Sequence, residues 1–167
     1  MSCTLSIIGK NFDVDLFLKK TKLRPHHVFL KGEPIFKTQP KSKRRQYSGI
    51  TILTSTRNFK NLKAQINATI RYLNRNKVKL RFISRTKEVQ YAILDFGIDS
   101  DMLSKKFSHS EIFPNKLLRL AAELGLDIEV SIYHTASKWK TAANIRFGTM
   151  ADEEKMPFVP FVAKLWS

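Results

Sequence analysis

A stretch of fifty-four residues, from Pro34 to Lys87, contains no aspartate or glutamate but carries fifteen lysines and arginines. The whole chain of 167 residues has 30 basic and 14 acidic residues, so the rest of the chain holds 15 bases against 14 acids and is nearly neutral. Self-repulsion among like charges opposes a compact state. Any fold of this chain must therefore expose the basic side chains of the stretch to water or to an anionic partner.

The remaining composition is typical of one globular domain. Hydrophobic residues make up 43% of the chain and charged residues 26%, which suits a single hydrophobic core at this length. Cys3 is the single cysteine, so an intrachain disulfide is excluded. Residues Met1 to Lys10 lack the pattern of a signal peptide, and no apolar run is long enough to span a membrane. We expect a cytoplasmic protein without a membrane span; the sequence does not indicate its oligomeric state.

The N-terminal residues predict a strand followed by a short helix. Thr4–Gly9 is short, rich in β-branched residues and ends in glycine, which is typical of a strand. Asp13 is a suitable N-cap for a helix that runs to Leu23. The helix is expected to end there because a residue that precedes a proline, here Pro25, disfavours the helical conformation.

Residues 25–48 contain three prolines and a glycine, so we expect a long irregular loop, and Gly49–Thr54 predicts a second strand. Ser55 or Asn58 then caps the main helix. The apolar positions of this helix are spaced by four, four and three residues, at Leu62, Ile66, Ile70 and Leu73. A basic row runs beside them, at Lys60, Lys63, Arg71 and Arg75. Because the two rows lie about 100° apart around the axis, one faces the core and the other faces out.

Residues 76–87 fit two interpretations. Val78, Leu80 and Phe82 alternate with basic residues, which is typical of a strand. Leu80 and Ile83 also continue the apolar row of the preceding helix. We favour a helix kinked at Asn76, and the strand stays an open alternative.

The second half predicts a strand at Val89–Phe96, a polar loop at Gly97–Ser110, a helix that begins at Pro114 and stops at Gly125, and a strand at Ile128–Tyr133. These elements predict an α/β or α+β fold with one mixed sheet of four to five strands packed by about three helices. We expect residues 1–134 to form a single domain. Residues 135–167 are then a C-terminal extension that packs on this domain or on a partner.

Three segments carry a resemblance to a known family. They are Ser6–Asp13 (SIIGKNFD), Leu30–Glu33 (LKGE) and, most specifically, Lys116–Tyr133 (KLLRLAAELGLDIEVSIY). The chain resembles a bacterial family of small domains, domain-of-unknown-function family 4279. The resemblance implies a small cytoplasmic α/β domain with no known catalytic residues. Members look like the small partners found near bacterial toxins, which implies an immunity role.

The basic stretch and this resemblance together predict a non-enzymatic binding protein of immunity type. It would neutralise an acidic, toxin-like partner protein, and its basic residues would raise the rate of association. The candidate partner-binding residues are Lys43, Arg44, Arg45, Lys60, Lys63, Arg71 and Arg75.

The alternative is a nucleic-acid-binding protein that uses the same basic residues on phosphates, with binding that weakens steeply as salt rises. Aromatic residues that interleave the bases could offer stacking surfaces; they are Tyr47, Phe59, Tyr72 and Phe82.

The chain lacks the motifs of common catalytic and metal sites. It has no G-x-S-x-G, no glycine-rich phosphate loop and no H-E-x-x-H, and its four histidines lack further ligands at metal-binding spacing. We therefore predict no metal, no cofactor and no enzymatic activity. The clustered carboxylates Asp95 and Asp99, with Glu88, leave a metal-dependent hydrolase as a third hypothesis, although we expect Asp95 to lie at a solvated strand end.

Overall fold

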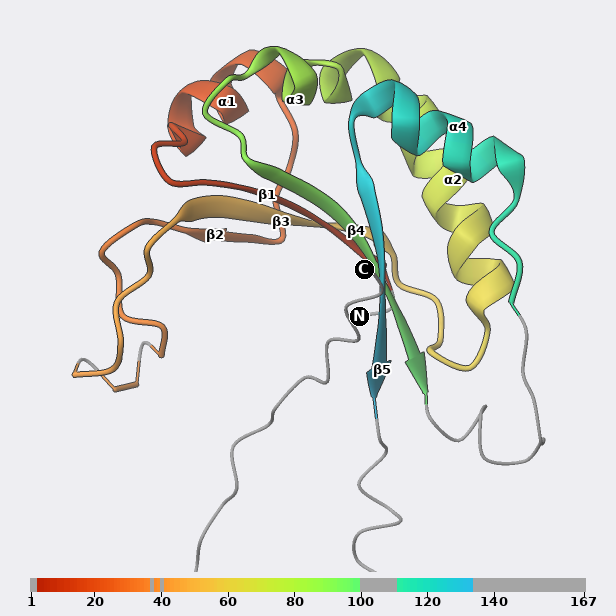
Figure 1. Cartoon of the computed structure of the whole chain (residues 1–167), viewed down its shortest axis with the longest axis horizontal. Helices are drawn as coiled ribbons and strands as arrows, with labels where there is room; N and C mark the ends of the chain where they lie inside the picture. Colours follow the sequence, from red (N-terminus) through yellow and green to blue (C-terminus); the bar gives the residue numbers. More distant parts are fainter. Residues whose placement is uncertain (1–2, 37, 40, 100–110, 134–167) are drawn as a thin grey trace, which may run out of the picture.

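A computed structural model describes residues 3–36, 38–39, 41–99 and 111–133 of the chain. These residues contain five strands and four helices (Figure 1). The strands are β1 (Cys3–Gly9), β2 (His27–Phe29), β3 (Ser48–Ser55), β4 (Tyr91–Asp99) and β5 (Asp127–Tyr133). The helices are α1 (Val14–Thr21), α2 (Leu62–Leu80), α3 (Phe82–Arg85) and α4 (Asn115–Leu124).

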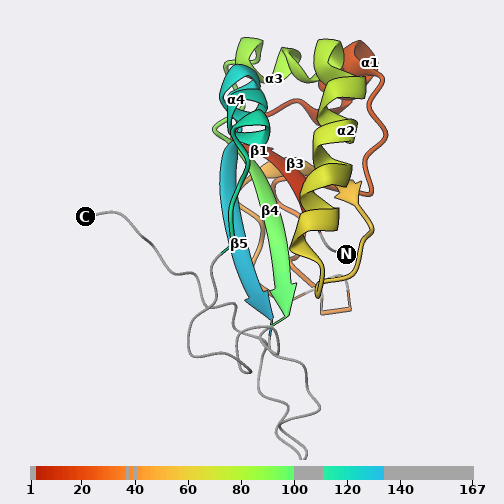
Figure 2. The same ribbon diagram turned by 90° about the vertical axis from the view of Figure 1, so that its right-hand side faces the viewer.

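The five strands form one sheet in the order β2-β3-β1-β4-β5. All neighbouring pairs are antiparallel except β4 and β5, which are parallel. The four helices lie on one face of this sheet, as Figures 1 and 2 show from two directions. The fold is therefore α+β with a mixed five-stranded sheet, which confirms the predicted architecture. None of the described helices is long and apolar enough to cross a membrane.

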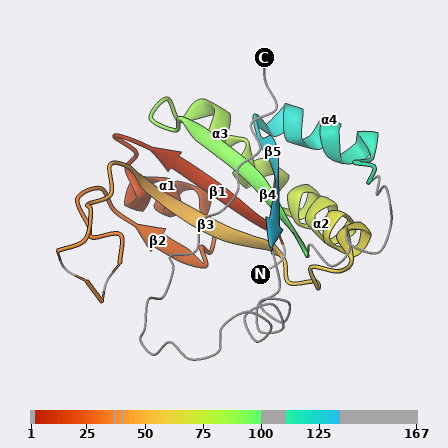
Figure 3. The ribbon, with the colours of Figure 1, turned by 60° about the horizontal axis from the view of Figure 1, so that its bottom comes forward.

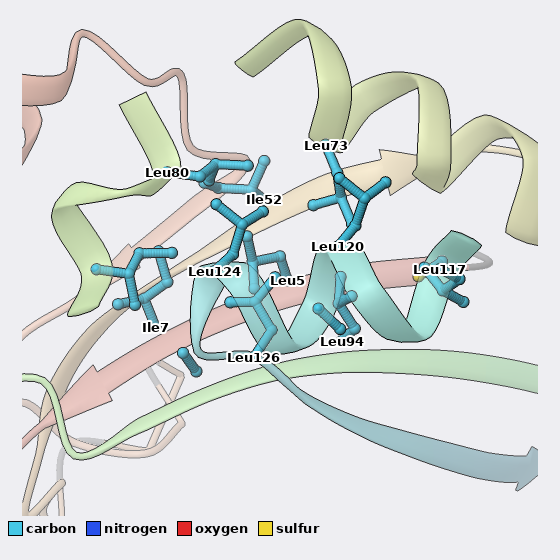
Figure 4. Packing of buried hydrophobic residues seen from close by; sticks show 14 of the residues in the cluster. Leu5, Ile7, Ile52, Leu73, Leu80, Leu94, Leu117, Leu120, Leu124 and Leu126 are labelled. Carbon is cyan, nitrogen blue, oxygen red and sulfur yellow. The ribbon is translucent and has the colours of Figure 1, made fainter. Parts of the chain in front are cut away.

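The hydrophobic core lies between the sheet and the helices. Alternate residues of β1 are buried on the helix side, with Leu5 and Ile7 fully enclosed. Leu73 of α2 and Leu120 of α4 pack over these strands (Figure 4). The predicted apolar row of α2 is confirmed, because all four of its members are at most 7% exposed.

The predicted start of α1 is also confirmed. The Asp13 side chain accepts a hydrogen bond from the Leu16 amide at 2.9 Å, which caps the helix. The helix ends at Thr21, two residues before the predicted end. Lys22 adopts a left-handed conformation (φ 53°), and its amide donates to the Leu18 carbonyl, which turns the chain toward β2.

Two predictions in the next segment are wrong. Residues 25–48 are not wholly irregular, because β2 pairs with β3 and the His26 amide donates to the Thr51 carbonyl at 2.8 Å. Strand β2 has three residues, which are too few to show a periodic pattern. The prolines and the glycine of the segment instead indicated a loop. The cap of α2 is Asn61, whose side chain accepts from the Ala64 amide at 2.9 Å. Asn58 instead accepts from the Lys60 amide in the preceding turn.

The favoured helical interpretation of residues 76–87 is confirmed for all of them except Arg81, Thr86 and Lys87, and the break falls at Arg81 rather than at Asn76. The main helix continues to Leu80, and α3 follows at once, so that Leu80 and Ile83 are both buried against the core. Strand β4 extends past its predicted end through Gly97 to Asp99. Residues 100–110 of the predicted loop, and the extension after Tyr133, lie outside the described residues.

Helix α4 begins one residue later than predicted. Pro114 has extended backbone angles and is the N-cap, so Asn115 is the first helical residue. Gly125 ends the helix in the left-handed conformation (φ 67°), as expected.

Candidate binding surface

The side of α2 that points away from the sheet is basic along its length. The α2 solvent face consists of Lys63, Asn67, Arg71, Asn74, Arg75 and Val78, all of them exposed. Val78 is 76% exposed, although it is apolar. At 19 residues the helix is about 28 Å long, so this face is long enough to meet a macromolecule.

The bases at the N-terminal end of α2 oppose the helix dipole, whereas Lys77 and Lys79 in the last turn complement it. No acidic residue occupies the first turn, where Lys63 lies and Lys60 precedes it. Positive charge at a helix N-terminus costs roughly 0.3–1 kcal/mol at the surface, whereas negative charge is favoured there. The two N-terminal bases therefore do not serve the stability of α2, and they create a place where an anionic group would be stabilised.

Two of the fifteen bases are neutralised within the described part of the chain. Lys77 Nζ lies 2.7 Å from Glu123 Oε2, and Arg81 Nη2 lies 2.8 Å from Glu123 Oε1. Hydrogen bonds from Lys77 and Arg81 hold the pKa of the Glu123 carboxyl below its ordinary value. These ion pairs connect α2 to α4 and use the side of α2 that adjoins α4, so the α2 solvent face keeps its charge.

The basic loop between β2 and β3 is separate from that face. Arg44 Nη1 donates to the Gly32 carbonyl at 2.7 Å, and Arg45 Nη2 donates to the Ile35 carbonyl at 3.2 Å. The Arg45 guanidinium also lies 4.8 Å from the centre of the Phe29 ring. Both arginines therefore hold the loop together.

Figure 3 shows this loop and α2 at opposite ends of the molecule. The structure thus brings Lys63, Arg71 and Arg75 together along α2, with Lys60 in the turn just before the N-cap of this helix. It places Lys43, Arg44 and Arg45 on a different element, away from them.

Charge is divided between the two layers of the fold. The four helices contain ten lysines and arginines but only two acids, Asp15 and Glu123. The five strands contain no lysine or arginine and four acids, Asp95, Asp99, Asp127 and Glu129. Strand alternation and the β4–β5 register direct all four acids to the sheet face opposite the helices.

The aromatic residues of the basic stretch do not form a stacking surface on α2. Tyr72 and Phe82 are partly buried and pack against the core. The Phe59 ring lies 5.3 Å from the ring of Tyr133, at the end of the sheet, and Tyr47 lies beside Tyr91. None of the four stands among the exposed bases of the α2 solvent face.

A polar hollow lies on the face of the sheet opposite the helices. Its volume is about 380 Å³, and it is lined by Thr4, His26, His27, Thr51, Asp95, Gly97 and Tyr133. Asp95 lies in the middle of β4 rather than at its end, because β4 continues to Asp99; the predicted solvated strand end is therefore wrong.

Asp95 is half-buried in this hollow. Its Oδ1 atom is buried without a hydrogen-bond partner among the described residues. Burial raises the pKa of the Asp95 carboxyl, and hydrogen bonds from the side chain and backbone of Ser131 oppose that rise. Burial also raises the pKa of the Tyr133 hydroxyl, and the nearby charge of Asp95 adds to the effect. Through Asp95, the hollow can accept a hydrogen bond from a polar group. The residues that line it come from all five strands and their connections, so local sequence patterns did not predict it.

The carboxylates of the hydrolase hypothesis do not form one group. Glu88 precedes β4 by three residues and lines a separate hollow with Lys10 and Lys87. Its distance from Asp95 along an extended chain is up to about 23 Å. No cluster of three or more histidine, cysteine, aspartate or glutamate residues suited to a metal ion occurs within the described residues. Burial raises the pKa of the Cys3 thiol to about 11, so Cys3 is not a thiolate nucleophile at neutral pH.

Comparison with protein families assigns the chain. The family model described as Domain of unknown function (DUF4279) matches residues 1–135. The chain belongs to this family. The match spans every strand and helix of the DUF4279 domain described above, from β1 to β5. No curated protein and no solved structure matches the chain.

Proposed function

We propose that this DUF4279 protein is a non-enzymatic binding protein of immunity type that neutralises an acidic partner protein. The observation that carries the proposal is the α2 solvent face, where Lys63, Arg71 and Arg75 face solvent on a helix that contains no acid. Such a face is destabilised by self-repulsion, and Lys63 in the first turn also interacts unfavourably with the helix dipole; an acidic partner relieves both effects. The exposed Val78 adds an apolar contact at the same face.

The proposal predicts how the partner is recognised. Complementary charge mainly raises the association rate and selects the partner, while the buried contacts set the lifetime of the complex. The association rate should therefore fall as salt rises, with a smaller change in the dissociation rate. We place this activity in the cytoplasm, where Cys3, a buried free thiol, would stay reduced.

The experiment starts with the full chain carrying an affinity tag in its native host. Stoichiometric proteins are recovered, identified by mass spectrometry, purified, and measured for binding and for loss of their activity in the complex. A triple variant, Lys60→Glu, Lys63→Glu and Arg71→Glu, reverses the charge on the α2 solvent face and at its N-terminal end. A matched variant, Lys19→Glu, Lys20→Glu and Lys116→Glu, makes the same change of net charge on α1 and α4.

The proposal expects one acidic protein that binds the wild type and the matched variant but is lost by the α2 variant. Equal binding by both variants, or no stoichiometric partner, would contradict it. A generic DNA duplex and a single-stranded RNA are measured in parallel at several salt concentrations. A strong linear dependence of log affinity on log salt, with loss in the α2 variant, would instead assign the face to nucleic acid.

A further inference from the structure

A second basic site lies on the flank of α2, beside the connection between α1 and β2. This cationic groove has a volume of about 620 Å³. It is lined by Lys22, Leu23, Arg24, Pro25 and His26 of the connection, by Ile52 and Leu53 of β3, and by Tyr72, Arg75, Asn76 and Lys79 of α2. In Figure 2 the connection runs down from α1 beside the upper part of α2. Among the described residues, the lining holds four permanent cations and a histidine, and no acid.

The groove is fixed by contacts that do not depend on a ligand. Leu23 is only 6% exposed and anchors the connection in the core. The His26 amide donates to the Thr51 carbonyl at 2.8 Å, which fixes the far end of the connection to β3. Lys79 Nζ donates to the Lys22 carbonyl at 3.2 Å, which ties α2 to the turn after α1. The cations are therefore held on two walls that cannot move apart freely.

Four cations without an acid repel one another, and the ion pairs that relieve Lys77 and Arg81 do not reach this side of α2. Arginine offers paired donors that match phosphate oxygens, and lysine supplies a compact charge with three donors. One of the Lys79 protons is used by the Lys22 carbonyl, which leaves two for a ligand. The charge of the groove suits a ligand with more than one phosphate group.

The remaining lining is apolar or aromatic. Leu53, Pro25 and the half-buried Tyr72 can pack against a flat ring. A volume of about 620 Å³ lies within the usual range for small-ligand clefts, roughly 300–1,000 Å³. Burial raises the pKa of the Tyr72 hydroxyl, so it stays a hydrogen-bond donor at neutral pH.

We propose that the cationic groove binds a small ligand that carries two or more phosphate groups and a flat ring, such as a nucleoside diphosphate or triphosphate. This site is distinct from the α2 solvent face and does not rest on the proposed function. Arg75 lies at the border of the two, so it is left unchanged in the variants that separate them.

Adenosine triphosphate and inorganic triphosphate are titrated into the full chain by calorimetry. The groove variant is Arg24→Gln with Lys79→Gln, and the matched control is Lys63→Gln with Arg71→Gln, which removes the same charge from the α2 solvent face. We expect adenosine triphosphate to bind more tightly than inorganic triphosphate because of the ring. The groove variant should lose at least about tenfold in affinity, and the control no more than about threefold.

A measurement on the unchanged protein covers the case in which the groove variant is poorly folded. In amide NMR spectra, adenosine triphosphate should shift Arg24, Tyr72 and Lys79 strongly and Lys63 weakly. Absence of binding by both compounds, equal loss in the two variants, or shifts centred on Lys63 would each overturn the proposal. Tighter binding of a single-stranded oligonucleotide, with equal sensitivity to both variants, would likewise overturn it and assign the charge to a nucleic-acid surface.

Discussion

The environment of Asp95 has a measurable effect on stability. Burial raises its folded-state pKa above the ordinary value of 3.8, so the ionised carboxylate destabilises the folded chain at neutral pH. That cost is fully present above the folded-state pKa and disappears below the unfolded-state pKa. Asp95→Asn removes the charge and keeps one oxygen for Ser131. We expect a higher melting temperature than wild type at pH 7, and a difference that vanishes as the pH falls toward 3.8.

Asp127→Asn is the control for this change. Asp127 is an exposed acid on the same sheet face, so its neutralisation should leave the melting temperature nearly unchanged at both pH values. A lower melting temperature for Asp95→Asn at pH 7 would show that the carboxylate is stabilised by groups outside the hollow described here.

Single residues with a local role could be predicted from the sequence, and residues defined by tertiary contacts could not. Asp13 and Gly125 cap helices, and their signals lie within a few positions of them. The sequence predicts Asp95 at a solvated strand end, because Gly97, two residues later, begins the predicted polar loop. Gly97 instead lies within β4, and its missing side chain leaves room for the Phe59 ring, a contact across 38 positions of sequence.

At the scale of the elements, the start of α2 rests on one hydrogen bond. Asn61 accepts from the Ala64 amide, and its replacement by alanine leaves that donor to water. Asn61→Ala should lower the free energy of unfolding by about 1 kcal/mol. Chemical denaturation measures this change.

Asn67→Ala is the matched substitution within the same helix. Asn67 is exposed and lies in the second turn, where alanine has the higher helix propensity, so this variant should be no less stable than wild type. Equal losses for Asn61→Ala and Asn67→Ala would argue against the capping role.

The packing of α2 against α4 should depend on pH and salt through Glu123. Its folded-state pKa is lowered by Lys77 and Arg81, so the stabilisation is present above the unfolded-state pKa and is lost as the pH falls through the folded-state pKa. Glu123→Gln should lower the melting temperature slightly at pH 7 in low salt. The difference should shrink in about 1 M salt, where exposed ion pairs are screened.

Glu88→Gln provides the comparison, since Glu88 is exposed and forms no ion pair with another described residue. A salt-independent difference between Glu123→Gln and wild type would mean that the side chain acts through packing rather than through charge.

Most elements were predictable because their periodicity spans several turns or a whole strand. The row from Leu62 to Leu73 identified the buried side of α2, β-branched residues before a glycine identified β1, and alternation identified β5. The misassigned elements are those with little periodicity. Strand β2 has three residues and depends on β3 for its hydrogen bonds. The predicted cap of α2 is wrong because Asn58 and Asn61 are both suitable capping residues. The backbone conformation of the turn between them determines that Asn61 is the N-cap.

On the scale of the whole molecule, the ten bases of the helix layer should make stability rise with salt. Repulsion within the layer is greatest at low ionic strength and is screened as salt is added. The melting temperature should therefore increase between about 20 mM and 500 mM sodium chloride. Lys63→Gln with Arg71→Gln should reduce this increase. A melting temperature that falls with salt would mean that attractive pairs dominate.

The net charge could be predicted from composition, but its distribution could not. The sequence grouped bases of the whole acid-free stretch as one set of partner-binding candidates, whereas the fold places the loop between β2 and β3 and helix α2 at opposite ends of the molecule. Arg44 and Arg45 donate hydrogen bonds to backbone carbonyls of the loop that carries them. Glu123, far along the chain, neutralises two bases of the helical half. Only the topology decides which charges meet.

The division between basic helices and an acidic sheet also makes the described fold an electric dipole. In the field of a large anion, such a body experiences a torque that turns the helices forward while the two molecules are still separated by water. Collisions then begin in one preferred orientation, and the acidic sheet is held away from the anion. The layered placement of charge thus selects the face that arrives first, before any side chain makes contact.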